Sequence, residues 1–337
     1  MTYETQNTEG SPLMESVLYE VKKLIVGQDH LLERMLVALL ARGHILVEGV
    51  PGLAKTLAIK TLAESIGGEF KRIQFTPDLV PADLVGTRIY NQKTGEFSTS
   101  LGPVFTNLLL ADEINRAPAK VQSALLEVMQ EHQVTIGRET YHVSEPFLVL
   151  ATQNPIETEG TYPLPEAQVD RFMMKVLVDY PNEQEEFVIV ERMTGALMPV
   201  GKVITTQQLI ELQQETDKVY ADPALMEYAV RIVSATRRPA EYGAGDIAKY
   251  ILYGCSPRAS INLILTGRAL AFLRGRSYVL TQDIQDMALD VMRHRLVLSY
   301  EALSDNVTAD MVLARVLQRV GAPVQPLKER VVLSVNA

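Results

Sequence analysis

The sequence predicts an α/β fold, in which a parallel sheet with helices on both faces is followed by an all-helical domain. In the first half of the chain, short apolar runs alternate with helical patterns, which is typical of a parallel α/β sheet. Beyond residue 181 only helical patterns remain. The 337 residues are also too many for one compact core. We therefore predict two domains, residues 1–181 and residues 182–337, with a boundary near Pro181.

Five runs in the first domain have the composition of buried parallel strands. Each run is apolar on both faces, as expected when helices cover both sides of a sheet. The predicted strands are residues 44–49, 70–75, 107–113, 147–153 and 173–180.

Helical spacing and turn residues define the elements around these strands. Residues 119–132 place apolar side chains on one stripe, with Pro118 suited to the first turn. In the second domain, Ser256 and Pro257 suit the start of one helix, and another begins at Thr281.

Two segments predict β-hairpins added to the sheet domain. Residues 88–100 turn near Thr94 and Gly95, and residues 133–143 alternate on either side of Gly137.

Composition limits the class of protein. Hydrophobic residues make up 47% and charged residues 22%, as in soluble globular proteins, and no apolar run could span a bilayer. The first residues lack a basic-then-apolar leader, so we expect a cytoplasmic protein. Cys255 is the only cysteine, which excludes an internal disulfide and a thiolate zinc cluster. The net charge of -9 argues against nucleic acid as a partner.

Residues 44–64, HILVEGVPGLAKTLAIKTLAE, match a phosphate-binding loop between a strand and a helix, except that Ala54 replaces a glycine. Such a loop presents backbone N–H groups to an anion at a helix N-terminus. We expect this loop to bind ATP or ADP, with Lys55 reaching the β- and γ-phosphates of ATP and Thr56 ligating Mg²⁺. A plain strand-to-helix turn is the alternative. The predicted nucleotide contacts here are Gly49, Val50, Pro51, Gly52, Leu53, Ala54, Lys55, Thr56 and Leu57.

Ala54 raises a conformational question, because glycine at this position permits a positive φ. An alanine held there costs about 1–2 kcal/mol. That cost is small beside the binding of a triphosphate and its metal. The loop therefore either tolerates the strain or bends differently.

Carboxylates and an amide follow two of the later strands. The run 107–113 ends in Asp112 and Glu113, which we assign to the Mg²⁺ shell and to activation of the attacking water. Asn154 follows the run 147–153, at the edge of the sheet where ligands bind, and could sense the γ-phosphate. A solvated acidic turn and a turn asparagine are the alternatives for these residues.

Together these motifs resemble the MoxR family of AAA+ ATPases, and the resemblance covers nearly the whole chain. GVPGLAKT resembles the family's own phosphate loop, with its alanine. LLLADEINRAP and LATQNPIE resemble the second acidic motif and the first sensor. VGQD, which contains Val26 and Gly27, is similar to the segment around adenine. EAQVDRF and GCSPRA resemble the arginine-finger segment and the second sensor, which assigns these roles to Arg171 and Arg258.

The resemblance implies an αβα ATPase core, a helical lid and a ring, commonly a hexamer. The two hairpins would be the insertion in the second helix and the hairpin before the first sensor. It also implies chaperone-like work on partner proteins, often with von Willebrand factor A domains. The alternatives are a motor subunit of a magnesium-chelatase-like or nucleic-acid machine, and a nucleotide-binding scaffold that turns over little.

Several arginines are candidates for contacts with phosphate or with a neighbouring subunit. Arg171 could stabilise charge on the γ-phosphate of a neighbouring subunit, with Arg116 as a second candidate. Arg258 would lie in the first turn of a helix, which suits a cation only when an anion lies opposite. For any of them a surface ion pair is the simpler alternative. We expect the other arginines of the helical domain to form a solvated or inter-subunit surface; these are residues 268, 274, 276, 293 and 295.

Overall fold

The computed structural model describes residues 11–50, 53–93, 95–155, 160–195 and 198–323. Within these ranges the chain forms two compact units. The sheet unit contains residues 11–216, and the helical unit contains residues 217–323.

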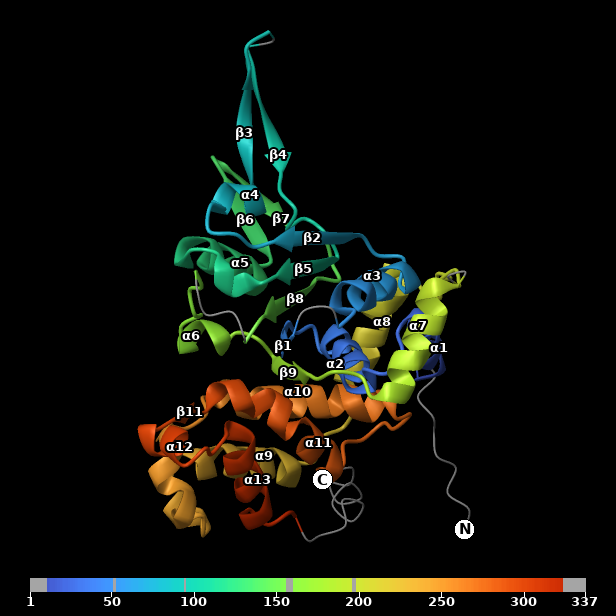
Figure 1. Ribbon diagram of the computed structural model, residues 1–337. Coiled ribbons are helices and arrows are strands. Elements are labelled where there is room, and N and C mark those ends of the chain that lie inside the picture. The colour runs from blue at the N-terminus through green and yellow to red at the C-terminus, as the bar shows by residue number, and fades with distance from the viewer. Residues whose placement is uncertain (1–10, 51–52, 94, 156–159, 196–197, 324–337) are drawn as a thin grey trace, which may run out of the picture. The chain divides into compact units, whose positions relative to one another are not determined.

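A five-stranded parallel sheet forms the centre of the sheet unit (Figure 1). The strand order is β2-β5-β8-β1-β9, and every neighbouring pair is parallel. The strands are β1 (Ile45–Gly49), β2 (Phe70–Gln74), β5 (Leu108–Asp112), β8 (Leu148–Gln153) and β9 (Met174–Val178). All five predicted strands therefore form, and the α/β prediction is confirmed.

The edge strand β2 corrects one expectation. Ile73 is buried, but Arg72 and Gln74 are exposed, so β2 is not apolar on both faces. The prediction of full burial was wrong for β2 because only β5 pairs with it. An edge strand of this kind can carry polar side chains.

Helices surround this sheet. Helix α5 has the predicted buried stripe, although Pro118 is its N-cap residue rather than part of its first turn. The helices of the unit are α1 (Ser11–Leu24), α2 (Asp29–Leu40), α3 (Lys55–Ser65), α4 (Pro81–Val85), α5 (Ala119–Glu131), α6 (Glu166–Val169), α7 (Glu183–Thr194) and α8 (Thr206–Asp217), with one 3-10 turn, η1 (Ile114–Arg116).

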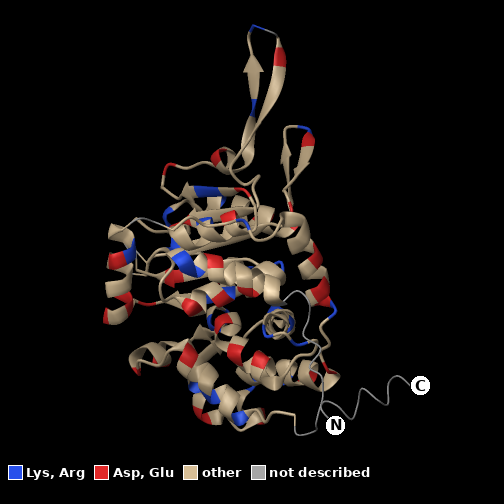
Figure 2. Ribbon diagram, turned by 90° about the vertical axis from the view of Figure 1, so that its right-hand side faces the viewer, with Lys and Arg blue, Asp and Glu red and all other residues tan. Residues whose placement is uncertain are grey.

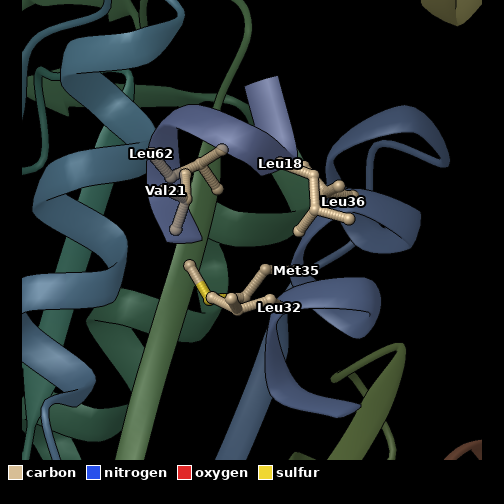
Figure 3. Close-up of a pocket in the computed structure, with 6 residues that line it drawn as sticks. All are labelled: Leu18, Val21, Leu32, Met35, Leu36 and Leu62. Carbon is tan, nitrogen blue, oxygen red and sulfur yellow. The ribbon is translucent and has the colours of Figure 1, made fainter. Parts of the chain in front are cut away.

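A small cavity lies where α1 packs against its neighbours. Figure 3 shows Leu18 and Val21 of α1 beside apolar residues of α2 and beside Leu62 of α3. The cavity among them is about 10 Å³. A space this small, with apolar walls, is not a ligand site.

Helices α7 and α8 belong to the sheet unit, so the compact units divide after Thr216 and not at residue 181. The Arg192 guanidinium of α7 donates to the Lys22 carbonyl at 2.7 Å. The Gln213 amide of α8 donates to the Leu39 carbonyl at 2.6 Å. A functional boundary near Pro181 stays a prediction.

Both predicted hairpins are present. Strands β3 (Gly86–Asn91) and β4 (Glu96–Leu101) form one, which extends well beyond the sheet (Figure 1). Strands β6 (Gln133–Ile136) and β7 (Glu139–His142) form the other, with Gly137 at a φ of 69°. Thr94, in the first predicted turn, lies outside the described residues.

The helical unit consists of helices and one short strand pair. Ser256 is the N-cap residue of α10 and Pro257 its first residue, as predicted. The elements are α9 (Pro223–Arg237), α10 (Pro257–Leu273), α11 (Thr281–Met292), α12 (Tyr300–Ser304) and α13 (Ala309–Arg319), strands β10 (Ile251–Tyr253) and β11 (Val297–Leu298), and 3-10 turns η2 (Pro239–Tyr242), η3 (Gly245–Tyr250) and η4 (Arg293–Arg295).

The solvated or inter-subunit surface expected of the arginines in this unit does not hold for Arg276 and Arg293, whose side chains are 18% and 10% exposed and form internal ion pairs. Arg274 and Arg276 both contact Asp283, whose side chain is fully buried. Arg293 contacts Asp290 and Asp310. These arginines therefore hold helices together.

Among the described residues, no helix has both the length and the apolar character needed to cross a membrane.

Candidate functional site

The predicted phosphate loop joins β1 to α3 at the carboxyl edge of the sheet. A Cβ on Gly49 would lie 2.4 Å from the Val178 carbonyl oxygen, so the neighbouring strand β9 leaves room only for glycine. Ala54 is the N-cap residue of α3 with φ 54° and ψ 17°, in the left-handed region. The loop therefore keeps the conformation of a glycine and places the strain on an alanine.

Lys55 faces back over this loop. Its Nζ donates to the Gly49 carbonyl at 2.8 Å. Burial lowers the pKa of Lys55 below its ordinary value, whereas the charges of Asp112 and Glu113 act in the opposite direction. The ammonium group is thus partly desolvated and within the field of the acidic pair.

The remaining loop residues differ in exposure. Leu53 is buried, and Val50, Thr56 and Leu57 are half-buried. The other two predicted contacts, Pro51 and Gly52, lie outside the described residues.

The acidic pair follows β5, where the chain turns sharply. Glu113 has a φ of 55°, so it leaves the extended path directly after Asp112. Thr152 of β8 joins the two residues: its hydroxyl donates to Asp112 Oδ1 at 2.6 Å and accepts from the Glu113 N–H at 2.8 Å. This turn brings together two carboxylates that an extended strand would direct to opposite faces.

The other contacts of the acidic pair come from β2 and from η1. Arg72 donates to Asp112 Oδ2 at 2.7 Å. Glu113 Oε2 accepts from the Gln74 amide at 2.7 Å and contacts Arg116 Nε at 2.9 Å. Both carboxylates are thereby fixed from the edge of the sheet.

Sequence reasoning missed Thr152, Arg72 and Gln74. A signal did exist for the last two: polar residues occupy alternate positions at the end of a run that was predicted to be buried. Thr152 gave no comparable signal, because a buried threonine is ordinary in a strand.

Two further predicted segments reach the same edge. Asn154 directly follows β8 and is 9% exposed. In the predicted adenine segment, Val26 is half-buried, and Gly27 has a φ of 65° and lies against the Glu185 carboxyl. The next residue, Gln28, donates to the Asp179 carbonyl at 3.0 Å, just beyond β9.

A hollow of about 210 Å³ opens beside the phosphate loop. It lies between Gly49 and Val50 on one side and Val178 to Tyr180 on the other, with Pro155 also lining it. It is smaller than most pockets for whole ligands. All of these lining residues belong to the sheet unit.

The candidate arginines occupy three different settings. Arg171 follows α6 and donates to the Leu126 carbonyl of its own chain at 3.4 Å. Arg116 contacts Glu113, also of its own chain. Arg258 is exposed in the first turn of α10, as predicted.

Comparison with known proteins defines the class. Residues 44–174 match the model of the ATPase family associated with various cellular activities (AAA). Residues 244–316 match the AAA lid domain. A parallel-sheet unit with a phosphate loop and a separate helical lid is the fold expected for this class. The chain is therefore an AAA-type ATPase that binds nucleotide and hydrolyses ATP.

Individual relatives narrow the class further. Chaperone MoxR1 of Mycobacterium tuberculosis is 56% identical over 311 residues, which cover 92% of this chain and 82% of that protein. Protein MoxR of Paracoccus denitrificans is 34% identical, covering 82% and 86%. The crystal structure of a candidate ATPase from Cytophaga hutchinsonii superposes with a TM-score of 0.88 at 50% identity, covering 93% and 96%. This chain belongs to the MoxR family of AAA+ ATPases.

Proposed function

We propose that the chain hydrolyses Mg²⁺-bound ATP at the carboxyl edge of its sheet and uses the energy to remodel partner proteins. One observation carries this proposal: Lys55 and the acidic pair Asp112 and Glu113 face the same edge, close enough for the carboxylates to influence the ammonium pKa. A phosphate-binding cation opposite two carboxylates is the arrangement that phosphoryl transfer requires.

The residues present suit Mg²⁺. No group of three or more His, Cys, Asp or Glu side chains that could hold a metal occurs among the described residues. Mg²⁺ commonly takes only one or two protein oxygens, with phosphate oxygens and water completing its shell. Asp112 and the Thr56 hydroxyl would supply those oxygens. When bound, the ion neutralises charge on the phosphates.

Each of the site residues then has a distinct role in binding or hydrolysis. Lys55 exchanges the Gly49 carbonyl for phosphate oxygens, and the N–H groups at the start of α3 bind the same anion. Glu113 accepts the proton of the attacking water. Asn154 orients that water or contacts the γ-phosphate. Val26 and Gly27 lie against the adenine.

Arg171 and Arg258 belong to the parts of the reaction that need assembly. We assign Arg171 to the γ-phosphate of the neighbouring subunit in a ring, with six subunits as the expected size. Its hydrogen bond in the single chain is long, at 3.4 Å, and therefore weak. We assign Arg258 to nucleotide sensing in the lid. Arg116 is the second candidate for the trans role, although Glu113 holds it here.

The proposed partners are proteins with von Willebrand factor A domains, and the expected location is the cytoplasm. The name of the Mycobacterium tuberculosis relative, a chaperone, supports remodelling of proteins. The alternative is a motor subunit of a chelatase-like or nucleic-acid machine. Figure 2 shows Lys and Arg interspersed with Asp and Glu along the chain, and the net charge is -9, which argues against DNA as the partner. Stimulation of the ATPase by DNA would favour the alternative.

The decisive test is Glu113→Gln. A glutamine at position 113 keeps an oxygen that can accept the hydrogen bond from Gln74, but it removes the carboxylate that would act as the base. We expect ATP binding to persist while phosphate release falls by about 10²–10⁴-fold. Glu127→Gln is the matched control, because Glu127 is an exposed carboxylate on α5. Unchanged turnover in Glu113→Gln would reject the proposed role, and failure of both variants to bind ATP would reject the site.

A further inference from the structure

The backbone of Tyr162 is held by the stretch of chain that follows the acidic pair. Its N–H donates to the Asn115 carbonyl at 2.6 Å, and its carbonyl accepts from the Gln122 amide at 2.9 Å. Asn115 belongs to η1, directly after Glu113, whereas Gln122 belongs to α5. Both polar backbone groups of Tyr162 are therefore fixed by one short stretch, residues 115–122.

The Gln122 side chain joins three carbonyl groups. It is fully buried, and its Nε2 donates to the Ile114 carbonyl at 3.2 Å and to the Ala117 carbonyl at 3.1 Å, in addition to that of Tyr162. An amide nitrogen has two hydrogens, so one of them is shared between two of these acceptors. Gln122 therefore joins residues 113–117, here called the Glu113 turn, to a segment that is distant in the sequence.

The chain from Tyr162 to Arg171, here called the finger segment, lies along α5. The Gln168 amide donates to the Ser123 hydroxyl at 3.1 Å, and the Arg171 guanidinium donates to the Leu126 carbonyl at 3.4 Å. Residues of a helix that are three or four positions apart share a face. One face of α5 therefore contacts the finger segment from its beginning to the proposed trans-acting arginine.

The Glu113 turn carries the proposed base. Glu113 has a φ of 55°, and its Oε2 contacts Arg116 Nε at 2.9 Å within the same turn. The position of the carboxylate therefore depends on the conformation of the turn. In the proposed function, Glu113 serves the nucleotide site of its own chain, whereas Arg171 serves the site of a neighbouring subunit. Gln122 lies between residues that act at two different sites.

We propose that Gln122 is a positioning residue that couples these two sites, because its amide holds the Glu113 turn and the finger segment in one arrangement. This inference rests on the proposed functions of Glu113 and Arg171. A change in the turn at one site, such as the one that follows departure of the γ-phosphate, then moves the arginine that serves the next site. The coupling passes through hydrogen bonds and packed residues of a single chain.

The simpler alternative is a buried glutamine that only completes the start of α5. Its contacts with the Ile114 and Ala117 carbonyls would then serve folding, and its contact with Tyr162 would be incidental. Such a residue affects the stability of the chain. A coupling residue affects both the chain that supplies Glu113 and the chain that supplies Arg171, even when these are different molecules.

The test uses two inactive forms of the full chain, mixed in equal amounts and assembled. Arg171→Ala keeps the catalytic site but lacks the arginine, whereas Glu113→Gln keeps the arginine but lacks the base. Where the two forms are neighbours, the arginine of one serves the site of the other, and ATP hydrolysis returns. Gln122→Met is then added to one form at a time. This change keeps the approximate size of the side chain and removes its hydrogen-bond donor.

We expect Gln122→Met to lower the restored phosphate release by about 10-fold in either form, with the KM for ATP changed by less than about twofold. Gln122→Glu should recover nothing, because an ionised carboxylate cannot donate to the three carbonyls. Gln130→Met is the matched control, since Gln130 is an exposed glutamine of the same helix. It should leave the restored hydrolysis unchanged.

Ser123→Ala is a second variant that does not alter a buried site. Ser123 is exposed, and its hydroxyl contacts the finger segment through Gln168. We expect a loss of about twofold to threefold when Ser123→Ala is added to the Glu113→Gln form, which supplies the arginine. The same change in the Arg171→Ala form should have no effect.

The outcomes separate the two proposals. If the two inactive forms restore no hydrolysis on mixing, the proposed trans role of Arg171 fails, and the coupling role fails with it. Restored hydrolysis that falls only when Gln122→Met is in the Arg171→Ala form would overturn the coupling alone. A loss that Gln130→Met shares would do the same. If Gln122→Met does not assemble, an equal effect of Ser123→Ala in both forms, or no effect in either, overturns the coupling.

Discussion

Asp283 in the helical unit and Asp112 in the sheet unit are both held by arginine side chains. Asp283 is fully buried and accepts from Arg274, Arg276 and the Leu280 N–H. The Asp112 side chain is 19% exposed, and Arg72 approaches it from the edge strand. The chemistry of the two pairs is the same, but their access to water differs.

This difference distinguishes a closed network around Asp283, which we expect to be structural, from an open network around Asp112, which we propose to be catalytic. Asp283 lies at the start of α11, and its partners come from the segment after α10, so the cluster joins two helices. Asp112 lies at the end of a parallel strand, where a ligand can approach. We therefore expect replacements at the open network to change turnover and replacements at the closed network to change stability.

The largest expected effect is the loss of turnover in Lys55→Met. Without the ammonium group the phosphates lose their cation, and we expect turnover to fall by about 10⁴-fold, or ~5 kcal/mol. Stability should not fall, because burial already disfavours the charged lysine. Phosphate release and the melting temperature are the two measurements. Lys60→Met, which alters an exposed lysine of the same helix, is the control.

A lower melting temperature in Lys55→Met would contradict the expectation that residues around Asp112 affect turnover and not stability. So would normal turnover in this variant.

The closed network gives the opposite pattern. Asp283→Asn removes one charge and leaves two arginines without their buried partner, so we expect a loss of about 3–5 kcal/mol in the stability of the helical unit. Calorimetry with chemical denaturation measures it. Asp286→Asn is the control. The Asp286 side chain is 26% exposed and contacts Arg274 but not Arg276, so we expect a loss of stability of about 1 kcal/mol or less. Equal losses in the two variants would contradict the role of burial.

The same contrast explains what the sequence could predict of the fold. Strands β1 and β8 were predicted within one residue, because continuous apolar runs give a strong local signal. The strand β2 was placed correctly but its burial was wrong, because its position at the sheet edge depends on strand order. The prediction for Arg293 was wrong because this residue pairs with Asp310, 17 residues away, and no local pattern indicates that contact.

The candidate site shows the same limit. Lys55, Asp112 and Glu113 follow recognisable patterns within short segments, so they were identified together. Thr152 and Gln74 contact that pair only because β5 lies between β2 and β8. Strands that are adjacent in this sheet are far apart in the chain. The supporting contacts of the site therefore require the three-dimensional structure.

A buried group of the sheet unit gives the third prediction, which concerns pH. His44 is buried; its Nδ1 accepts from the Val149 N–H at 3.0 Å, and its Nε2 donates to the Met129 carbonyl at 3.1 Å. Burial lowers the pKa of His44 from 6.5 to about 4. Because the folded pKa is depressed, protons bind the unfolded chain preferentially. The stability is complete above pH 6.5 and falls as the pH drops toward 4.

The expected loss is about 3 kcal/mol between these limits. Denaturation of the unmodified chain and of His44→Gln across this pH range measures it, and the variant should lack this part of the dependence. Parallel curves for the two proteins would contradict the assignment. His44 is not a member of the acidic pair. We therefore expect its protonation to lower the stability of the fold and not to act directly on turnover.

The smallest expected effect concerns Ala54 of the phosphate loop. Its φ of 54° is costly for alanine and free for glycine, so we expect Ala54→Gly to stabilise the sheet unit by about 1 kcal/mol. The control is Ala58→Gly, four residues later within α3, where the same change should cost about 1 kcal/mol. Opposite signs for one chemical change would show that the loop stores strain beside Lys55. If Ala54→Gly and Ala58→Gly lower the stability equally, the backbone at Ala54 is not strained.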